Sequence, residues 1–264
     1  MAKARTRLDA LLVERGLYES RSRAAAAVIA GEVRLADRGT IPKPGQLVAP
    51  EAGVEVAEPP RFVSRGGVKL ANALAALEID PQGRACLDVG ASTGGFTDCL
   101  LQGGADAVTA LDVAHGALHW RIRNHPRVTV LERVNARALE ASALPYRPDL
   151  IVVDVSFISL AKVLPAVLAC AAERFDCLAL VKPQFEVGRE RVGRGGVVRS
   201  AEDRRSALVS VGEAALAFGY SVLGFKSSGL PGPAGNLESF VWIGPQDDAR
   251  AVDSVTATAG RAEP

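Results

Sequence analysis

The chain has 264 residues, of which 48% are hydrophobic and 23% are charged, and its formal net charge is +1. This composition is ordinary for a globular protein with one or two domains, and it excludes a chain that is polycationic along its whole length. Any basic surface that binds nucleic acid must therefore be local. The front of the chain has such an excess, because residues 1–43 contain nine lysines and arginines against five acidic residues.

The four cysteines are widely spaced, at positions 86, 99, 170 and 177. They form no Cys-x-x-Cys pair, which argues against a zinc or redox motif and suggests free thiols in a reducing compartment. His115 and His119 are four residues apart, but no third ligand is evident, so we expect no metal. The sequence has neither the apolar core of a signal peptide nor an apolar run of the ~18 residues that span a bilayer. We therefore expect a cytoplasmic protein without stable membrane association.

The first 58 residues are typical of a small α+β module. Leucine periodicity predicts a helix over residues 6–16, and Ser20 is placed to cap a second helix that Gly31 ends. Short strand-like segments follow at 32–35, 46–49 and 53–57. Paired prolines then favour an extended linker over residues 59–64.

Longer strands and helices alternate in the rest of the chain. Strands are expected near 85–89, 107–113, 128–132, 150–155, 178–182, 221–226 and 239–243. Helices are expected at 64–77, 96–102, 160–172 and 201–218. This alternation predicts a Rossmann-like, doubly wound α/β sheet with a largely parallel core over residues 65–245. Residues 246–264 contain few large apolar side chains, and we expect them to form a flexible tail.

A glycine-rich turn follows the first long strand, with the spacing Gly-x-x-x-Gly-Gly from Gly90 to Gly95. Glycine lets the backbone turn sharply and approach a ligand closely. Asp112 ends the next strand, 22 residues after Gly90, where a carboxylate can accept hydrogen bonds from a ribose. The turn and Asp112 together suit an adenosine without a pyrophosphate. A ligand-free turn and a dinucleotide site are the alternatives.

Several segments, 88–97, 154–159, 181–188 and 230–238, resemble the TlyA family of bacterial 2′-O-ribose rRNA methyltransferases. The catalytic domain of that family is similar to FtsJ. The resemblance covers about residues 5 to 244. The front module, through residues 7–16, 20–23 and 31–33, is similar to the S-four-like RNA-binding domain. This resemblance implies a methyltransferase that uses S-adenosyl-L-methionine and acts on ribosomal RNA.

The resemblance also implies a Lys–Asp–Lys–Glu tetrad, which matches Lys69, Asp154, Lys182 and Glu238 in this sequence. A ribose 2′-hydroxyl is a weak nucleophile that must lose its proton as it attacks a sulfonium methyl group. A lysine partly withdrawn from water can act as the general base, and Lys182, after an apolar strand, is our choice. The two carboxylates would orient the lysines, and Lys69 would position the ribose or its phosphate. Taken singly, each member could instead be a solvated charge, a helix cap or a surface ion pair.

The cofactor contacts carried over in the same way are Gly90, Ser92, Gly94 and Phe96 at the methionine end, Asp112 at the ribose and Asn135 at the adenine. Asn135 could instead cap a loop. The expected RNA-phosphate contacts are Arg5, Arg7, Arg21, Arg23, Lys43 and Arg65. A second basic, glycine-rich segment at 189–199 is expected to form a loop at the mouth of the site.

Three classes of function follow from these patterns. The first is a monomeric enzyme that methylates a cytidine ribose in small-subunit rRNA, large-subunit rRNA or both. The second is a catalytically silent RNA-binding or ribosome-assembly factor, and the third is a membrane-active haemolysin. The complete tetrad and the glycine turn favour the first class. The absence of a spanning segment or a strongly amphipathic cationic helix argues against the third.

Overall fold

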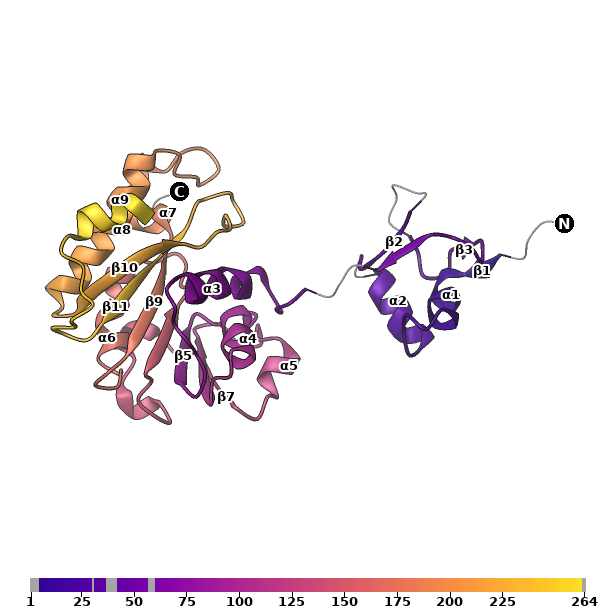
Figure 1. The fold of residues 1–264 in the computed structure, drawn as a ribbon, viewed down its shortest axis with the longest axis horizontal. Coiled ribbons are helices and arrows are strands. Elements are labelled where there is room, and N and C mark those ends of the chain that lie inside the picture. The colour runs from indigo at the N-terminus through magenta and orange to yellow at the C-terminus, as the bar shows by residue number, and fades with distance from the viewer. Residues whose placement is uncertain (1–4, 30, 37–41, 57–59, 263–264) are drawn as a thin grey trace. The chain divides into compact units, whose positions relative to one another are not determined.

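The computed structural model describes residues 5–29, 31–36, 42–56 and 60–262 (Figure 1). The chain divides into two compact units, Met1–Pro60 and Arg61–Pro264. Each unit has a hydrophobic core of its own, and the second unit holds two buried clusters.

The linker predicted at 59–64 is shorter in the structure. Residue 59, like 57 and 58, lies outside the described ranges, whereas residues 61–64 are packed on the second unit. Phe62 is buried in the core of that unit, and the backbone N–H of Val63 donates to Asp98 at 2.8 Å. The guanidinium group of Arg61 lies over the Phe62 ring, 4.8 Å from its centroid. The buried side chain of Phe62 therefore anchors this segment to the second unit.

The N-terminal unit combines two helices with two antiparallel strand pairs. The elements are β1 (Thr6–Arg7), α1 (Leu8–Glu14), α2 (Arg21–Ile29), β2 (Val33–Leu35), β3 (Leu47–Val48) and β4 (Val54–Val56). β1 pairs with β3, and β2 pairs with β4. Thr6 and Arg7, which we predicted to begin the first helix, form a strand because β3 supplies partners for their backbone groups. Leu8, Leu12 and Val28 are completely buried and hold the two helices together.

The second unit is built on a seven-stranded sheet. Its strands are β5 (Ala85–Val89), β6 (Ala107–Asp112), β7 (Val128–Glu132), β8 (Leu150–Val153), β9 (Asp176–Val181), β10 (Ser221–Ser227) and β11 (Ser239–Gly244). Its helices are α3 (Arg65–Ala76), α4 (Gly95–Gln102), α5 (Trp120–Arg123), α6 (Leu164–Leu168), α7 (Pro183–Glu186), α8 (Ala201–Ala217) and α9 (Val255–Ala262). The strand order is β10-β11-β9-β8-β5-β6-β7.

The order of the strands sets the position of the site. β5 to β9 are parallel, and β11 runs antiparallel to both of its neighbours. The chain begins in the middle of the sheet at β5, adds β6 and β7 on one side, and then crosses to β8 and β9 on the other. The strand order therefore reverses between β5 and β8. In open α/β sheets a ligand binds at the carboxyl ends of the strands at such a reversal.

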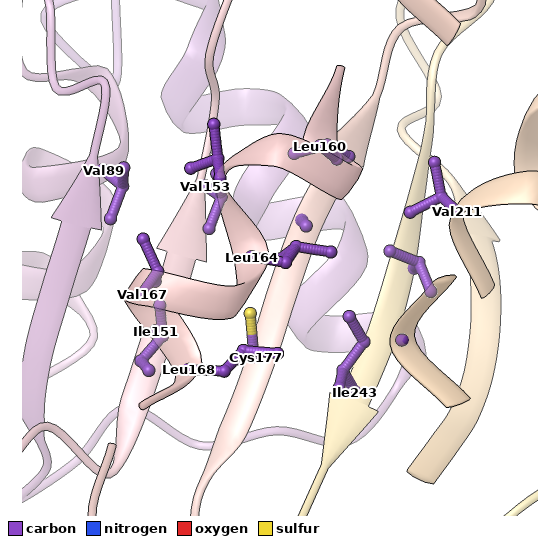
Figure 2. Close-up of a cluster of buried hydrophobic side chains, with 14 of the residues drawn as sticks. Val89, Ile151, Val153, Leu160, Leu164, Val167, Leu168, Cys177, Val211 and Ile243 are labelled. Carbon is purple, nitrogen blue, oxygen red and sulfur yellow. The ribbon is translucent and has the colours of Figure 1, made fainter. Parts of the chain in front are cut away.

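Both faces of the sheet are covered, because successive side chains of a strand point to opposite faces. Val89, Ile151 and Val153 face a cluster that includes residues of α6, α8 and α9 (Figure 2). Cys86, Leu150 and Val152, an odd number of positions away along the same strands, face the cluster that includes α3 and α4. These strands are buried on both faces, which explains why they read as continuous apolar runs in the sequence.

Two predicted elements are corrected by the structure. The helix expected over 160–172 is a 3-10 turn (Leu160–Lys162) followed by the short α6. Pro165 lies in the first turn of α6, where its missing N–H costs no hydrogen bond, so α6 starts late.

The segment 246–264, expected to be a flexible tail, contains the helix α9. Val255 and Ala259 of α9 are buried, and α9 contacts α8 and β10. A Cβ atom on Gly212 of α8 would lie 2.7 Å from Val255. The two helices therefore approach closely through small residues, which a search for large apolar side chains overlooks.

Candidate active site

A cavity of about 450 Å³ opens at the carboxyl ends of the strands, at the reversal between β5 and β8. Its walls come from the start of α3, the turn after β5, the ends of β8 and β9, and the loop before β11. This volume is in the range of pockets that hold small molecules. All four residues of the expected tetrad line the cavity.

The first lysine and the glutamate of the expected tetrad form a buried ion pair. Lys69 on α3 donates from Nζ to Glu238 Oε2, and the two atoms are 2.5 Å apart. Their side chains are only 8% and 2% exposed. Charges so far from water are tolerated only when they are paired. α3 and the loop before β11 are thereby joined across the cavity, although their paired residues are 169 positions apart in the sequence.

The second lysine and the aspartate form a more open pair. Lys182 follows β9, and Asp154 follows β8, so adjacent parallel strands bring them together. Lys182 Nζ lies 2.6 Å from Asp154 Oδ1 and donates a hydrogen bond to Ser156 Oγ at 2.8 Å. Asp154 Oδ1 itself accepts no well-directed hydrogen bond. The Lys182 side chain is 13% exposed and lies on the cavity wall, within reach of a ligand.

The glycine turn after β5 brings two strand ends into close contact. Gly90 has a φ of +85°, and a Cβ atom there would lie 2.4 Å from the carbonyl oxygen of Asp154. Only glycine fits this position. Ser92 and Phe96 also line the cavity, and Phe96 packs on Phe240 with ring centroids 5.8 Å apart.

Three of the expected cofactor contacts lie outside the cavity wall. Gly94 is covered by side chains that follow β6 and caps the start of α4. Asp112 accepts backbone hydrogen bonds from Ser92 at 2.7 Å and Ala114 at 2.8 Å, so it lies beside the turn. Asn135 is exposed, and its side chain accepts from the N–H of Arg137 at 3.1 Å. The cap that we kept as an alternative for Asn135 is the contact that the structure contains.

Asp88 is completely buried in β5, directly before this turn. Its Oδ2 atom accepts from the Thr97 backbone N–H at 2.9 Å and the Thr97 hydroxyl at 2.6 Å, whereas Oδ1 has no hydrogen-bond partner. Burial raises the pKa of Asp88 to about 7, and the Thr97 hydrogen bonds oppose that rise. A carboxylate that lacks one partner in the interior is costly, and such groups mark candidate functional sites.

Several residues on the cavity wall were not singled out from the sequence. Phe157 is 91% exposed, and its ring lies 5.2 Å from that of Phe185. Gln184 presents a buried Oε1 atom without a hydrogen-bond partner. Asn236 is buried, and its side chain bonds to the backbone of Gly196 and Val198 at 2.8 and 2.9 Å. Each lies within three residues of Asp154, Lys182 or Glu238 in the sequence, and this closeness could have indicated that they line the same cavity.

The expected RNA contacts are distributed over both units. Arg7 binds the buried Asp9 through two hydrogen bonds of 3.1 and 2.7 Å, and Arg21 reaches the same carboxylate at 3.4 Å. The Arg7 contact holds the pKa of Asp9 below its ordinary value. The side chains of Arg7 and Arg21 remain about half exposed. The remaining expected contacts are exposed residues: Arg5, Arg23 and Lys43 in the N-terminal unit, and Arg65 on the cavity wall.

Comparisons with known proteins identify the family to which the chain belongs. The model of the FtsJ-like methyltransferase family matches residues 62–245. The chain is 49% identical to the 16S/23S rRNA (cytidine-2′-O)-methyltransferase TlyA of Mycobacterium tuberculosis, over 92% of this chain and 91% of that protein. It is 36% identical to Hemolysin A of Brachyspira hyodysenteriae, over 88% and 97% of the two chains. A solved structure of a candidate hemolysin from Streptococcus thermophilus covers 98% of this chain, with 96% of its own length, at a TM-score of 0.72 and 37% identity. The chain belongs to the FtsJ-like methyltransferase family and, within it, to the TlyA family of rRNA methyltransferases.

Proposed function

We propose that this protein transfers a methyl group from S-adenosyl-L-methionine to the 2′-hydroxyl of a cytidine in ribosomal RNA. The observation that carries the proposal is the pair of lysine–carboxylate contacts, Lys69–Glu238 and Lys182–Asp154, on one cavity of an FtsJ-like domain. The relative from Mycobacterium tuberculosis bears the name of this activity.

The chain offers a fitting place for the methyl donor. Gly90 lines the cavity, and its lack of a side chain lets the backbone of Asp154 pack against the turn, so the ends of β5 and β8 meet at the cavity. Directly before the turn, the buried Asp88 Oδ1 atom lacks a hydrogen-bond partner, which is the kind of unsatisfied group that marks a functional site. The aromatic Phe96 adds an apolar wall. When bound, the cofactor supplies an electrophilic methyl group on a sulfonium centre.

Lys182 is placed to accept the proton that the 2′-hydroxyl loses. Its Nζ atom lies on the cavity wall and is held from one side by Asp154 and from the other by Ser156. Lys69 is tied to Glu238 and buried more deeply, so it is suited to orient the ribose rather than to exchange protons with water. General-base catalysis of this kind contributes about 10²–10⁴ to a rate, and alignment of the hydroxyl with the methyl group contributes further.

The N-terminal unit is proposed as an S-four-like RNA-binding domain. Arg7 and Arg21, oriented by Asp9, and the exposed Arg23 and Lys43 would contact phosphates. Substitution of Arg23 and Lys43 together by alanine should weaken binding to ribosomal subunits and reduce the slope of log affinity against log salt by roughly 1–2. An unchanged slope would remove these residues from the interface.

The alternatives are less well supported. A silent assembly factor has no need of two paired lysines on a cavity. Within the described part of the chain, none of the helices has the length and apolar character of a helix that crosses a bilayer. We also propose a cytoplasmic monomer, the simplest form in which such an enzyme meets ribosomal RNA.

The proposal is tested by methyl transfer in vitro. Purified protein is incubated with labelled S-adenosylmethionine and with isolated small or large ribosomal subunits, and the RNA is then digested and analysed by mass spectrometry. We expect 2′-O-methylcytidine from at least one subunit. A methylated base, or no transfer to either subunit, would refute the assignment.

A further inference from the structure

The loop between β8 and α6 carries a strained aromatic residue. Phe157 has a φ of +64°, in the left-handed region that a bulky side chain rarely adopts. The residue is 91% exposed and lines the cavity. Such a conformation persists only when the surrounding contacts determine it, and it is commonest where the chain has a functional task. The contacts on either side of Phe157 therefore matter.

Before Phe157 the loop is held by Lys182. The lysine contacts Asp154 at 2.6 Å and donates to Ser156 at 2.8 Å. After Phe157 the loop is held by Glu186. The Glu186 carboxylate accepts from the Ser159 hydroxyl at 2.7 Å and from the Leu160 backbone N–H at 2.8 Å.

Both anchors come from one short stretch of chain. Lys182 precedes α7, and Glu186 is the last residue of α7 (Pro183–Glu186). Phe185 lies between them and packs on the ring of Phe157. The stretch from Lys182 to Glu186 thus contacts the loop on both sides of the strained residue, at Asp154, Ser156, Phe157, Ser159 and Leu160.

The position of Glu186 is not that of an ordinary surface carboxylate. Burial raises its pKa, and the two hydrogen bonds from Ser159 and Leu160 oppose that rise. Glu186 does not line the cavity, so contact with a substrate does not explain it. Its two acceptor oxygens are instead directed at the loop that carries Asp154 and Ser156.

We propose that Glu186 is a positioning residue for the methyl transfer. By holding Ser159 and Leu160 it fixes the far end of the loop, so that Asp154 and Ser156 stay against Lys182 and the Phe157 ring stays at the cavity. This inference rests on the proposed function of the cavity. It adds a residue that acts through the loop and never touches the substrate.

Two substitutions at Glu186 separate positioning from other roles. Glu186→Ala removes both acceptors. Glu186→Gln keeps one acceptor for the Leu160 N–H, and its amide can donate to Ser159, because a serine hydroxyl can also accept. We expect kcat of Glu186→Ala to fall about 10- to 100-fold, with KM for S-adenosylmethionine within twofold and an intact melting transition. Glu186→Gln should retain at least a third of the activity.

The matched control is Glu213→Ala, since Glu213 is an exposed carboxylate on α8, away from the cavity wall. It should behave as the wild type. A wild-type kcat in Glu186→Ala would overturn the proposal, as would an equal loss in Glu186→Gln, which would assign the effect to the charge. An inactive wild-type protein would instead count against the proposed function.

A second measurement does not depend on catalysis. Chymotrypsin cleaves after exposed aromatic residues, and the site of cleavage can be identified by mass spectrometry. Release of the loop in Glu186→Ala should accelerate cleavage after Phe157 at least fivefold, with Glu186→Gln and Glu213→Ala near the wild-type rate. Equal cleavage of all four proteins would show that Glu186 does not hold the loop.

Discussion

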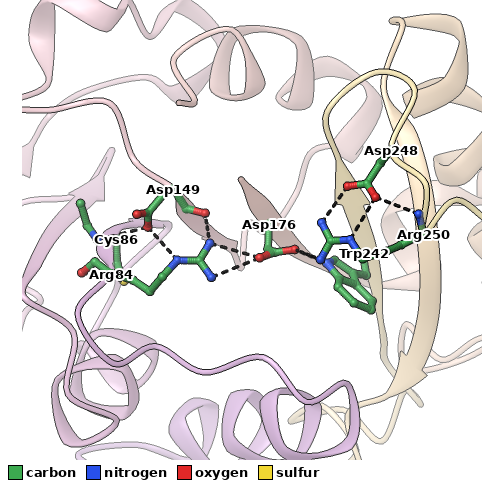
Figure 3. Close-up of polar contacts among 8 residues, drawn as sticks. Arg84, Cys86, Asp149, Asp176, Trp242, Asp248 and Arg250 are labelled. Carbon is green, nitrogen blue, oxygen red and sulfur yellow. Dashed lines mark hydrogen bonds and ion pairs between the residues drawn. The ribbon is translucent and has the colours of Figure 1, made fainter. Parts of the chain in front are cut away.

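The two ends of the central sheet both carry ion pairs, but they are built differently. At the amino ends of the strands, Arg84 binds Asp149 at 2.9 Å and Asp176 at 3.1 Å, and Asp176 also accepts from Arg250 and Trp242 at 3.0 Å each (Figure 3). At the carboxyl ends, lysines take the place of arginines, and each pair has a single contact of 2.5 or 2.6 Å.

The difference is clearest in the buried polar atoms that lack a hydrogen bond. Within the described residues there are three such side-chain atoms, and all belong to the carboxyl end of the sheet: Asp88 Oδ1, Asp154 Oδ1 and Gln184 Oε1. At the other end, Arg84 and Asp176 have no buried side-chain atom without a partner. A rigid arginine fork suits a permanent clamp, whereas a lysine can exchange a proton and turn towards a ligand. Buried polar atoms without a hydrogen-bond partner therefore mark the end of the sheet where we propose that the substrate binds.

The largest expected effect is that of Lys182→Ala. Loss of the proton acceptor should lower kcat by about 10³-fold or more, within the range for a general base, and leave binding to ribosomal subunits within threefold. Single-turnover methyl transfer and a filter-binding assay measure the two quantities. Lys226→Ala, at an exposed position on β10, is the control. Wild-type turnover in Lys182→Ala would show that the lysine at the carboxyl ends of the strands is not needed for catalysis, and the contrast with the amino ends would then have no functional meaning.

The second prediction concerns Asp88 and pH. With a pKa of about 7 in the folded protein and an ordinary value of 3.8, Asp88 keeps its proton in the folded state over a range where the unfolded chain has lost it. Stability from this group therefore falls as pH rises from about 4 to 7, at about 1.4 kcal/mol per pH unit, and then levels off. Asp88→Asn has no such proton and should show a flatter profile.

Guanidinium denaturation at pH 5 and pH 8 provides the measurement for Asp88. The wild type should lose about 3 kcal/mol more than Asp88→Asn between these values. Asp106→Asn, at an exposed position, should keep the wild-type slope. Parallel profiles for all three proteins would mean that Asp88 is ionised in the fold, and hence that its Oδ1 atom has a partner.

Much of the catalytic unit could be predicted because its signals are local. Strands with apolar runs, a glycine turn and polar residues at strand ends placed Gly90, Asp154 and Lys182 at one edge of a parallel sheet. Contacts between residues that are far apart in the sequence could not be predicted in this way. Arg84 meets Asp176 across 92 residues, and the acceptor role of Glu186 and the left-handed backbone of Phe157 depend on how two loops pack.

The third prediction concerns the clamp at the amino ends. Arg84→Met keeps the apolar stem but leaves Asp149 without its guanidinium partner and Asp176 with only Arg250 and Trp242. We expect unfolding to become easier by about 2–3 kcal/mol, below the value for a fully buried pair because Arg84 is 23% exposed. kcat of the folded protein should stay within twofold. A tenfold fall in kcat at unchanged stability would show that the clamp serves catalysis.

The smallest expected effect is that of Trp242→Phe. The change removes the indole N–H that donates to Asp176 at 3.0 Å, and it keeps a ring against which the Arg250 guanidinium can stack. Asp176 would still be bound by Arg84 and Arg250, so the loss should be about 1 kcal/mol, the net value of one hydrogen bond. Denaturation should show this loss of stability, and single-turnover methyl transfer should show an unchanged rate. A loss above the effect of Arg84→Met would mean that Trp242, rather than the arginines, holds the amino end of the sheet together.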